Sequence, residues 1–312
     1  MRIRLGYACL TKSLDVTASS IMTYTEYLKN KDMIKLDNII KSNLKDLATI
    51  IDYNLANNIY FYRLTSKLIP LATKEEVEFD YIKPYKKYYD KLKSKLKGIR
   101  IDVHPDQFTV LNSTKKEVVE ASIKNLEYHY NILDALGIKD KIILLHIGSS
   151  VLGKVNSIKR FINNFYKLPK YLQDCIAIEN DDKVFTIDDC IYISKKINIP
   201  IVLDYHHFIC NNINPNIEDF LVDIASSWEN RCYPIKMHFS SPKSKLKKEF
   251  RSHHEYINYQ DFICFLEKLK FLNKDIDIML EAKGKDEALF RLIRQLKLYS
   301  DYTFINNDIC LK

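Results

Sequence analysis

The stretch PIVLDYHH (200–207) decides the fold of this chain. It begins as an apolar run with branched side chains, which is typical of a buried strand, and it ends in an acid and two histidines. Seven other stretches follow the same plan, with an apolar run that ends at or near a polar or charged side chain. They are IRLGYA (3–8), IYFYRL (59–64), IRIDVHP (99–105), KIILLHIG (141–148), CIAIEN (175–180), PIKMHFS (234–240) and IDIMLEAK (276–283). We interpret the eight stretches as eight strands.

Segments with a helical spacing of apolar residues lie between these strands. They cover about residues 38–57, 81–96, 116–136, 157–172, 187–197, 217–228, 260–272 and 286–298. Strands that alternate with helices predict parallel pairing with right-handed crossovers. Eight such units predict an α/β fold, the (β/α)8 or TIM barrel, whose active site lies at the C-terminal ends of the strands. Since no internal repeat or linker interrupts the pattern, we expect one catalytic domain over residues 1–312.

The composition sets limits on the function. The chain is 46% hydrophobic, enough for a large core, and it has no apolar run long enough to span a membrane. Seven dispersed cysteines without a C-x-x-C pair favour a reducing cytoplasm. The formal charge of +8 favours a polyanionic partner, although a lysine-rich surface is often only well solvated. We therefore expect a soluble cytoplasmic protein.

Histidines, carboxylates and one lysine gather at the predicted strand ends. These residues are His104, His146, Glu179, Asp204, Lys236, His238 and Glu281. In a barrel the C-terminal strand ends surround a single pocket, so we expect these side chains to converge. A single histidine after a strand is more often structural, but packing does not explain such residues at six strand ends. Imidazole with carboxylate is the ligand set of zinc, manganese or iron, and several carboxylates predict more than one ion.

The period of a strand leaves the partner of Asp204 open. If the strand continued, side chains would alternate between its faces and His206 would share the face of Asp204. His207 can join Asp204 only if the strand ends near that residue and the chain turns. The residues alone do not decide between the two histidines.

Several segments resemble the UV damage endonuclease family. They are YRLTSKLIPLAT (62–73), HPDQF (104–108), LLHIG (144–148), IENDDK (178–183), LDYHHF (203–208), KMHFSSPKS (236–244), RSHHEY (251–256) and EAKGKD (281–286). These matches occur in order and span about residues 1–295. The family is similar in architecture to endonuclease IV-type enzymes and to xylose-isomerase-like barrels.

The resemblance implies a hydrolase that acts on double-stranded DNA without ATP. Such an enzyme incises immediately 5′ to cyclobutane pyrimidine dimers and 6-4 photoproducts, and often at abasic sites. In-line attack on the phosphodiester is expected to leave a 3′-hydroxyl and a 5′-phosphate. The resemblance also implies three divalent ions, usually manganese, with magnesium, cobalt or zinc as alternatives. We expect no membrane contact and no obligate protein partner.

The resemblance implies a ligand for each ion. It places the metal histidine three residues after Asp204, which favours His207 over His206, and its R-S-H pattern favours His253 over His254. The implied ligands are His104, His146, Glu179, Asp204, His207, Lys236, His238, His253 and Glu281, with Glu179, Lys236 and Glu281 as catalytic residues. We expect Glu179 to bridge two ions, with His104 and His146 on one side. Asp204, His238 and Glu281 are expected to hold the central region, and His207 and His253 a third ion with Lys236 nearby.

Lys236 is an unusual member of this set. It precedes His238 by two residues and therefore shares its face of the strand. A protonated ammonium among divalent cations is unfavourable. One alternative is therefore that Lys236 has only a structural role and points outward beside a helix. The resemblance implies instead a carboxylated lysine, which is negatively charged and offers oxygen ligands.

Recognition of damage requires further residues. Gln107 and Phe108 follow His104 on a loop, and an exposed polar–aromatic pair can wedge into a duplex where stacking is already weak. The alternative is a Phe108 buried under the barrel rim. The resemblance also implies that Tyr7 lies near the damaged nucleotides. One departure is Lys74, which stands where some family members carry a histidine.

Two other functions remain open from the residues. A sugar isomerase or epimerase on a similar barrel would also use histidines and carboxylates on metal, but the basic charge and the Gln107–Phe108 pair argue against it. A damaged-DNA binder without catalytic activity would leave the complete ligand set unexplained.

Overall fold

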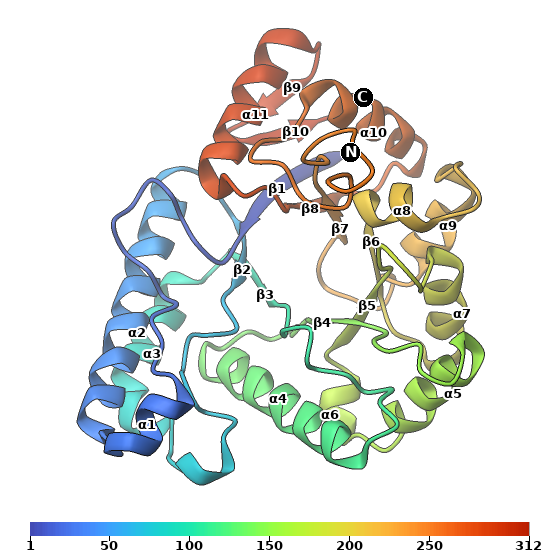
Figure 1. Ribbon diagram of the computed structural model, residues 1–312. Coiled ribbons are helices and arrows are strands. Elements are labelled where there is room, and N and C mark those ends of the chain that lie inside the picture. The colour runs from blue at the N-terminus through green and yellow to red at the C-terminus, as the bar shows by residue number, and fades with distance from the viewer. Residues whose placement is uncertain (312) are drawn as a thin grey trace.

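The eight apolar stretches form the eight parallel strands of a closed barrel in this computed structural model, which describes residues 1–311. The strands are β1 (Arg2–Ala8), β2 (Phe61–Leu64), β3 (Arg100–Val103), β4 (Ile143–His146), β5 (Ile176–Glu179), β6 (Ile201–Asp204), β7 (Ile235–Phe239) and β8 (Ile276–Leu280). Each pairs with the next, and β1 pairs with both β8 and β2 to close the ring (Figure 1). The predicted TIM barrel is confirmed.

Helices surround the barrel on its outside (Figure 1). They are α1 (Tyr24–Asn30), α2 (Met33–Ala56), α3 (Lys86–Lys95), α4 (Lys116–Ala135), α5 (Lys154–Phe165), α6 (Lys170–Gln173), α7 (Ile187–Ile197), α8 (Tyr205–Asn211), α9 (Glu218–Ser226), α10 (Tyr259–Leu269) and α11 (Lys285–Tyr299), with short 3-10 turns η1 (Glu75–Val77), η2 (Lys83–Tyr85) and η3 (Lys270–Leu272). The single helix predicted over 157–172 is wrong, because α5 ends before Pro169 and α6 begins after it. The sequence also did not predict α1 and α8.

Closure of the barrel depends on a close approach between β1 and β2. A Cβ atom at Gly6 would lie 2.5 Å from the carbonyl oxygen of Phe61, so only glycine fits there. The short β2 covers only the second half of β1, with Tyr7 opposite Tyr62. The first half pairs instead with an antiparallel hairpin, β9 (Thr303–Ile305) and β10 (Asp308–Cys310), which the sequence did not predict.

The barrel interior contains charge as well as apolar packing. Strand side chains are buried on both faces, as expected for parallel strands covered by helices. Arg100 is fully buried and its Nη1 lies 2.6 Å from Asp277, which also accepts two bonds from Arg4. Three aromatic ring centroids lie within 5.2 Å of the Arg100 guanidinium carbon, those of Phe61, Trp228 and Tyr233. The interior can therefore hold ions, provided that each has a partner.

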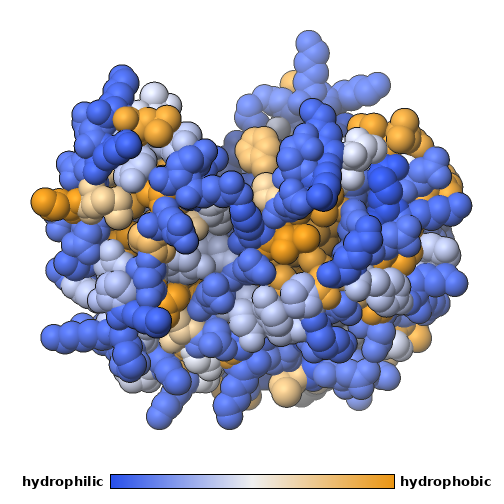
Figure 2. All heavy atoms as spheres, turned by 90° about the horizontal axis from the view of Figure 1, so that it is seen from below, coloured by the Kyte–Doolittle hydropathy of each residue, from blue (hydrophilic) through white to orange (hydrophobic). Residues whose placement is uncertain are grey.

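The side of the molecule seen in Figure 2 is mostly hydrophilic. Figure 2 shows charged and polar residues over most of one side, scattered apolar patches, and a notch between two raised parts at the upper edge. Within residues 1–311, no helix has both the length and the apolar character that crossing a membrane requires. All seven cysteines are free thiols.

Candidate metal centre

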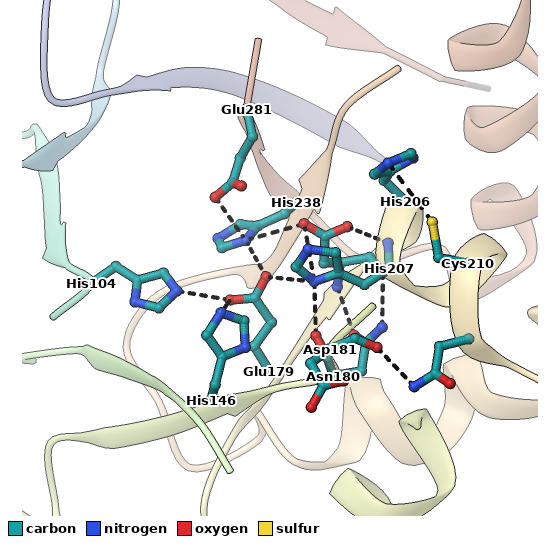
Figure 3. A network of polar contacts seen from close by, with 12 residues as sticks. His104, His146, Glu179, Asn180, Asp181, His206, His207, Cys210, His238 and Glu281 are labelled. Atoms are coloured by element: carbon teal, nitrogen blue, oxygen red, sulfur yellow. Dashed lines mark hydrogen bonds and ion pairs between the residues drawn. The ribbon is translucent and has the colours of Figure 1, made fainter. Parts of the chain in front are cut away.

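Side chains from separate strand ends meet around Glu179, the last residue of β5 (Figure 3). Its carboxylate is almost fully buried. Oε2 lies 3.1 Å from Nε2 of His104 and 4.0 Å from Nε2 of His146. Oε1 lies 2.9 Å from Nδ1 of His238. The structure thus brings together strand-end residues that are far apart in the sequence.

Two groups of candidate metal ligands share Glu179. Within each group one donor atom from every residue lies within 4.8 Å of the others. The first group is His104, His146 and Glu179, and the second is Glu179, Asp204, His238 and Glu281. This arrangement is the one expected if Glu179 bridges two ions.

Buried atoms without partners show that the donor set fits a cation. Oδ2 of Asp204 and Nδ1 of His146 are buried and form no hydrogen bond. A carboxylate oxygen withdrawn from water without a partner is unfavourable, and a metal ion would satisfy it. Nitrogen and carboxylate donors together suit manganese, zinc or iron. The cluster could therefore hold divalent ions.

The chain turns directly after Asp204. Strand β6 ends there and α8 begins, with Oδ1 of Asp204 accepting a hydrogen bond of 2.8 Å from the backbone N–H of His207. The turn brings Nδ1 of His207 to 3.7 Å from Glu179, whereas Nε2 of His206 faces the sulfur of Cys210 at 3.8 Å (Figure 3). The expectation that the strand ends and the chain turns is confirmed.

Hydrogen bonds orient the rings of three histidines by holding Nδ1 against a backbone carbonyl. The bonds run from Nδ1 of His207 to the carbonyl of Asn180 (2.9 Å), from Nδ1 of His253 to the carbonyl of Glu281 (2.8 Å), and from Nδ1 of His104 to the carbonyl of Pro105 (3.1 Å). Because a carbonyl only accepts, Nδ1 carries a proton and Nε2 is the nitrogen left to face an ion, which in His104 lies 3.1 Å from Oε2 of Glu179. This is the usual arrangement of a histidine that binds metal.

The neighbouring histidines make different contacts. Nδ1 of His254 lies 2.9 Å from the backbone nitrogen and 3.1 Å from the carbonyl oxygen of Tyr256, whereas Nδ1 of His253 lies 3.9 Å from Oε2 of Glu281. Nδ1 of His206 is buried without a partner. Geometry therefore favours His207 over His206 and His253 over His254 as ligands.

The buried carboxylates create a strong preference for positive charge. Burial would raise the pKa of Glu179, but the surrounding histidines, above all His238, bring it well below its ordinary value. Burial opposes a charged His207, but nearby carboxylates, above all Asp204, raise its pKa to about 9. Burial lowers the pKa of His104 to about 4 despite Glu179, so its imidazole is neutral and free to bind metal.

Arg63 is a member of the site that sequence reasoning missed. It is buried near the end of β2, where Nη1 lies 2.6 Å from Oε1 of Glu281 and Nη2 lies 2.6 Å from Nε2 of His238. The sequence offered one indication of this role, because Arg63 is the single charged residue in the strand FYRL, which is otherwise aromatic and aliphatic. Its guanidinium fixes the position of two candidate ligands.

Lys236 points into the barrel, so the alternative of an outward side chain is wrong. Its Nζ lies 2.6 Å from Oδ2 of Asp102, and both side chains are fully buried. The ammonium group thus pairs with a carboxylate on β3, and the expected place of Lys236 near His207 and His253 stays a prediction. Burial lowers the pKa of Lys236 to about 8 although Asp102 favours its charged form.

The residues expected to contact DNA divide into two kinds. Gln107 is exposed and Phe108 is 75% exposed, so the alternative of a buried Phe108 is wrong. Oδ1 of Asp106 fixes this loop by accepting a hydrogen bond of 2.9 Å from the backbone N–H of Phe108. Tyr7 is fully buried and donates its hydroxyl hydrogen to Asn54, which corrects its expected place beside the damaged nucleotides. Strand β1 directs the Tyr7 side chain into the core.

Comparison with known proteins gives the family. The family model described as UV-endonuclease UvdE matches residues 3–310. The chain belongs to the UvdE family of UV endonucleases. The UV DNA damage endonuclease of Bacillus cereus strain G9842 is 40% identical over 303 residues, which are 95% of each chain. That of Bacillus mycoides strain KBAB4 is 38% identical over 314 residues, which are 98% of each chain.

Solved structures agree with this UvdE assignment. The crystal structure of SacUVDE has a TM-score of 0.85 and 32% identity, and covers 95% of this chain and 98% of its own. Endonuclease IV from Thermus thermophilus shares the fold, with a TM-score of 0.59 and 13% identity over 96% of this chain and 100% of its own. D-psicose 3-epimerase from Clostridium cellulolyticum also shares the fold, with a TM-score of 0.52 and 12% identity over 76% of this chain and 80% of its own. The resemblance is confirmed, and family membership favours the endonuclease over the sugar isomerase or epimerase.

We expect the two adjacent histidines to differ in their effect on metal content. His207→Gln should lower the manganese retained after dialysis, because this variant lacks the imidazole Nε2 that the bond from Nδ1 to the Asn180 carbonyl leaves for an ion. His206→Gln is the matched control and should retain manganese, because His206 faces Cys210. Elemental analysis of both variants, with circular dichroism as the check on folding, measures the difference. Equal manganese content would contradict the distinction between them.

Proposed function

We propose that the protein is a metal-dependent endonuclease that incises double-stranded DNA immediately 5′ to UV photoproducts. Its substrates would be cyclobutane pyrimidine dimers, 6-4 photoproducts and abasic sites, and its products a 3′-hydroxyl and a 5′-phosphate. The observation that carries this proposal is the buried Glu179 carboxylate shared by two groups of metal-binding side chains, in a chain of the UvdE family.

We propose three manganese ions as the cofactor, replaceable by magnesium, cobalt or zinc. The proposed ligands are His104, His146, Glu179, Asp204, His207, His238, His253 and Glu281, with Lys236 after carboxylation. Bound ions of this kind activate water, neutralise charge on the phosphodiester and stabilise the departing oxyanion.

The protein prepares this site by fixing its ligands before substrate arrives. Asn180 donates from its side chain to the carbonyl of Asp204 (3.0 Å) and accepts from the backbone N–H of the same residue (2.9 Å). The carbonyl of Asn180 also orients His207. One residue next to Glu179 therefore sets the position of two ligands on the following strand and helix. Such prior positioning reduces the entropy that binding and reaction must overcome.

We propose that carbon dioxide adds to the neutral amine of Lys236, which loses a proton to give a carbamate. The positive charges of Arg63 and Arg100 disfavour the protonated ammonium and so favour an anion at this nitrogen, whereas Asp102 opposes it. Carboxylation would also free Asp102 from its pairing with the ammonium group. The carbamate would therefore need either the arginines or a metal ion as its partner.

Carboxylation can be measured without activity. Protein equilibrated with carbon-13-labelled bicarbonate and manganese should carry one labelled carbamate, seen by intact mass in neutral solution and lost on acidification. Lys236→Met should not carry it, whereas Lys283→Met, at an exposed lysine, serves as the control and should. Equal labelling of wild type and Lys236→Met would show that the carbamate lies elsewhere or is absent.

We expect damage-dependent nicking that needs the carboxylates. Labelled irradiated duplex should be cut in manganese and left intact with chelator, while unirradiated duplex stays intact. Glu179→Ala or Glu281→Ala should abolish nicking with the fold largely retained, because residues at this end of a barrel serve the site more than the core. Near-normal nicking and metal content in either variant would contradict the shared cluster, and binding without cutting by the wild type would favour a non-catalytic DNA binder.

We also propose that Gln107 and Phe108 fill the gap left when the joined pyrimidines leave the stack. The exposure of Phe108 on a loop held by Asp106 supports this role. The variant Gln107→Ala/Phe108→Ala should bind manganese normally, because neither side chain belongs to the cluster. Its preference for dimer-containing duplex should fall about ten- to a hundredfold, as expected for about 1–3 kcal/mol of lost stacking. An unchanged ratio of damaged to undamaged affinity at equal salt would rule out the wedge.

A further inference from the structure

Two large apolar side chains project from the loop between β4 and α5. Val151 is 53% exposed and Leu152 is 71% exposed. We call these two residues the apolar tip. The loop leaves the end of β4 at His146, so the tip lies on the same rim of the barrel as the metal centre. Neither the metal centre nor the proposed wedge uses it.

The backbone of the tip is held in place by hydrogen bonds. The carbonyl of Val151 accepts from Nη2 of Arg160 at 2.5 Å and from the hydroxyl of Ser157 at 3.2 Å. The carbonyl of Leu152 accepts from the side chain of Asn156 at 2.9 Å. The loop is therefore fixed by its polar backbone groups, while its apolar side chains remain in water.

Leu152 also has an unfavourable backbone conformation. Its φ angle is +65°, in the left-handed region that leucine rarely adopts. A left-handed residue is usually glycine or asparagine, and a leucine there costs conformational energy. Strain of this kind, combined with exposure of an apolar side chain, points to a contact made with another molecule.

The tip is joined to the loop that carries Gln107 and Phe108. The side chain of Asn112, on that loop, accepts from the backbone N–H of Ser149 and donates to its carbonyl, both at 2.8 Å. Arg160, which binds Val151, also donates to the carbonyl of Asn112 at 2.8 Å. A Cβ atom at Gly148 would lie 2.7 Å from Oδ1 of Asn112, so glycine permits the close approach. Hydrogen bonds therefore join the two loops to each other.

We propose that the apolar tip contacts duplex DNA beside the lesion, as a second insertion point next to Phe108. This inference rests on the proposed function. A lesion that has left the stack exposes apolar base faces and sugar edges on either side of the gap, and a fixed apolar side chain can cover them. Phe108 would fill the gap, and the tip would hold the flanking base pairs in their distorted arrangement. The tip thus acts on recognition of damage and leaves the ions untouched.

The substitution Leu152→Asn tests the tip without disturbing its backbone. Asparagine tolerates a positive φ angle, so the loop should keep its conformation and lose only its apolar contact. The matched control is Leu298→Asn, at a leucine that is 74% exposed in the last turn of α11, toward the opposite end of the barrel. Binding of labelled duplex with and without one cyclobutane dimer is measured at equal salt, with manganese content determined on the same samples.

We expect Leu152→Asn to weaken binding of the dimer-containing duplex about tenfold, as for loss of one buried apolar side chain. Binding of undamaged duplex, manganese content and the Leu298→Asn control should stay close to wild type. Equal weakening of binding to both duplexes, or no weakening, would overturn the proposed role of the tip. A change from dimeric to monomeric protein by light scattering, with unchanged damage preference, would instead assign the tip to self-association. If the wild type showed no preference for damaged duplex, both the proposed function and the proposed role of the tip would be contradicted.

Discussion

A carboxylate taken out of water must meet positive charge, and this constraint organises the barrel interior along its length. In one layer, Asp277 lies between Arg4 and Arg100. In another, Asp102 faces Lys236 at 2.6 Å. Each ion pair occupies interior volume that apolar side chains fill in many barrels, so each must be complete to be tolerated. Removing one partner would leave an unpaired buried charge, which costs far more than an ion pair contributes.

At the C-terminal ends of the strands, fewer lysine and arginine side chains lie beside the buried carboxylates. Glu281 pairs with Arg63, but the ion pairs of Glu179 and Asp204 among the described residues are all with histidines. Their pairing depends on protonated imidazole or on metal ions, and the rise in the pKa of His207 records the same demand for positive charge. Glu179 and Asp204 are themselves buried, but His146, His253 and Glu281 beside them are partly exposed, so this end of the barrel is open at its rim. The proposed ions would balance the charge of these carboxylates.

The sequence predicted the barrel because strands buried on both faces leave continuous apolar runs, and the polar residue that ends each run marks the site. It did not predict the β9–β10 hairpin, whose strands of three residues are too short to show a period. It could not separate the end of a strand from the start of α8, since seven residues complete barely two helical turns. The pairing of Lys236 with Asp102 joins residues far apart in the chain and follows only from closure of the ring. Tyr7 was misplaced because a residue near a strand end can still face the core.

The candidate metal ligands lie at strand ends and the proposed DNA contacts lie on loops, because binding ions requires more exact positions than contacting DNA. Ligands that must hold ions within a few tenths of an ångström stand at strand ends or on the first turn after them, where ladder hydrogen bonds fix the backbone. Phe108 and Leu152 stand on loops, where side chains can project beyond the rim, as the proposed contacts with a distorted duplex require. Loops alone would be too mobile for this purpose, and Asn112 and Arg160 compensate by bonding one loop to the other. If both loops contact damaged duplex as proposed, these hydrogen bonds would hold the two contacts in a fixed relation and help to place the phosphodiester over the metal centre.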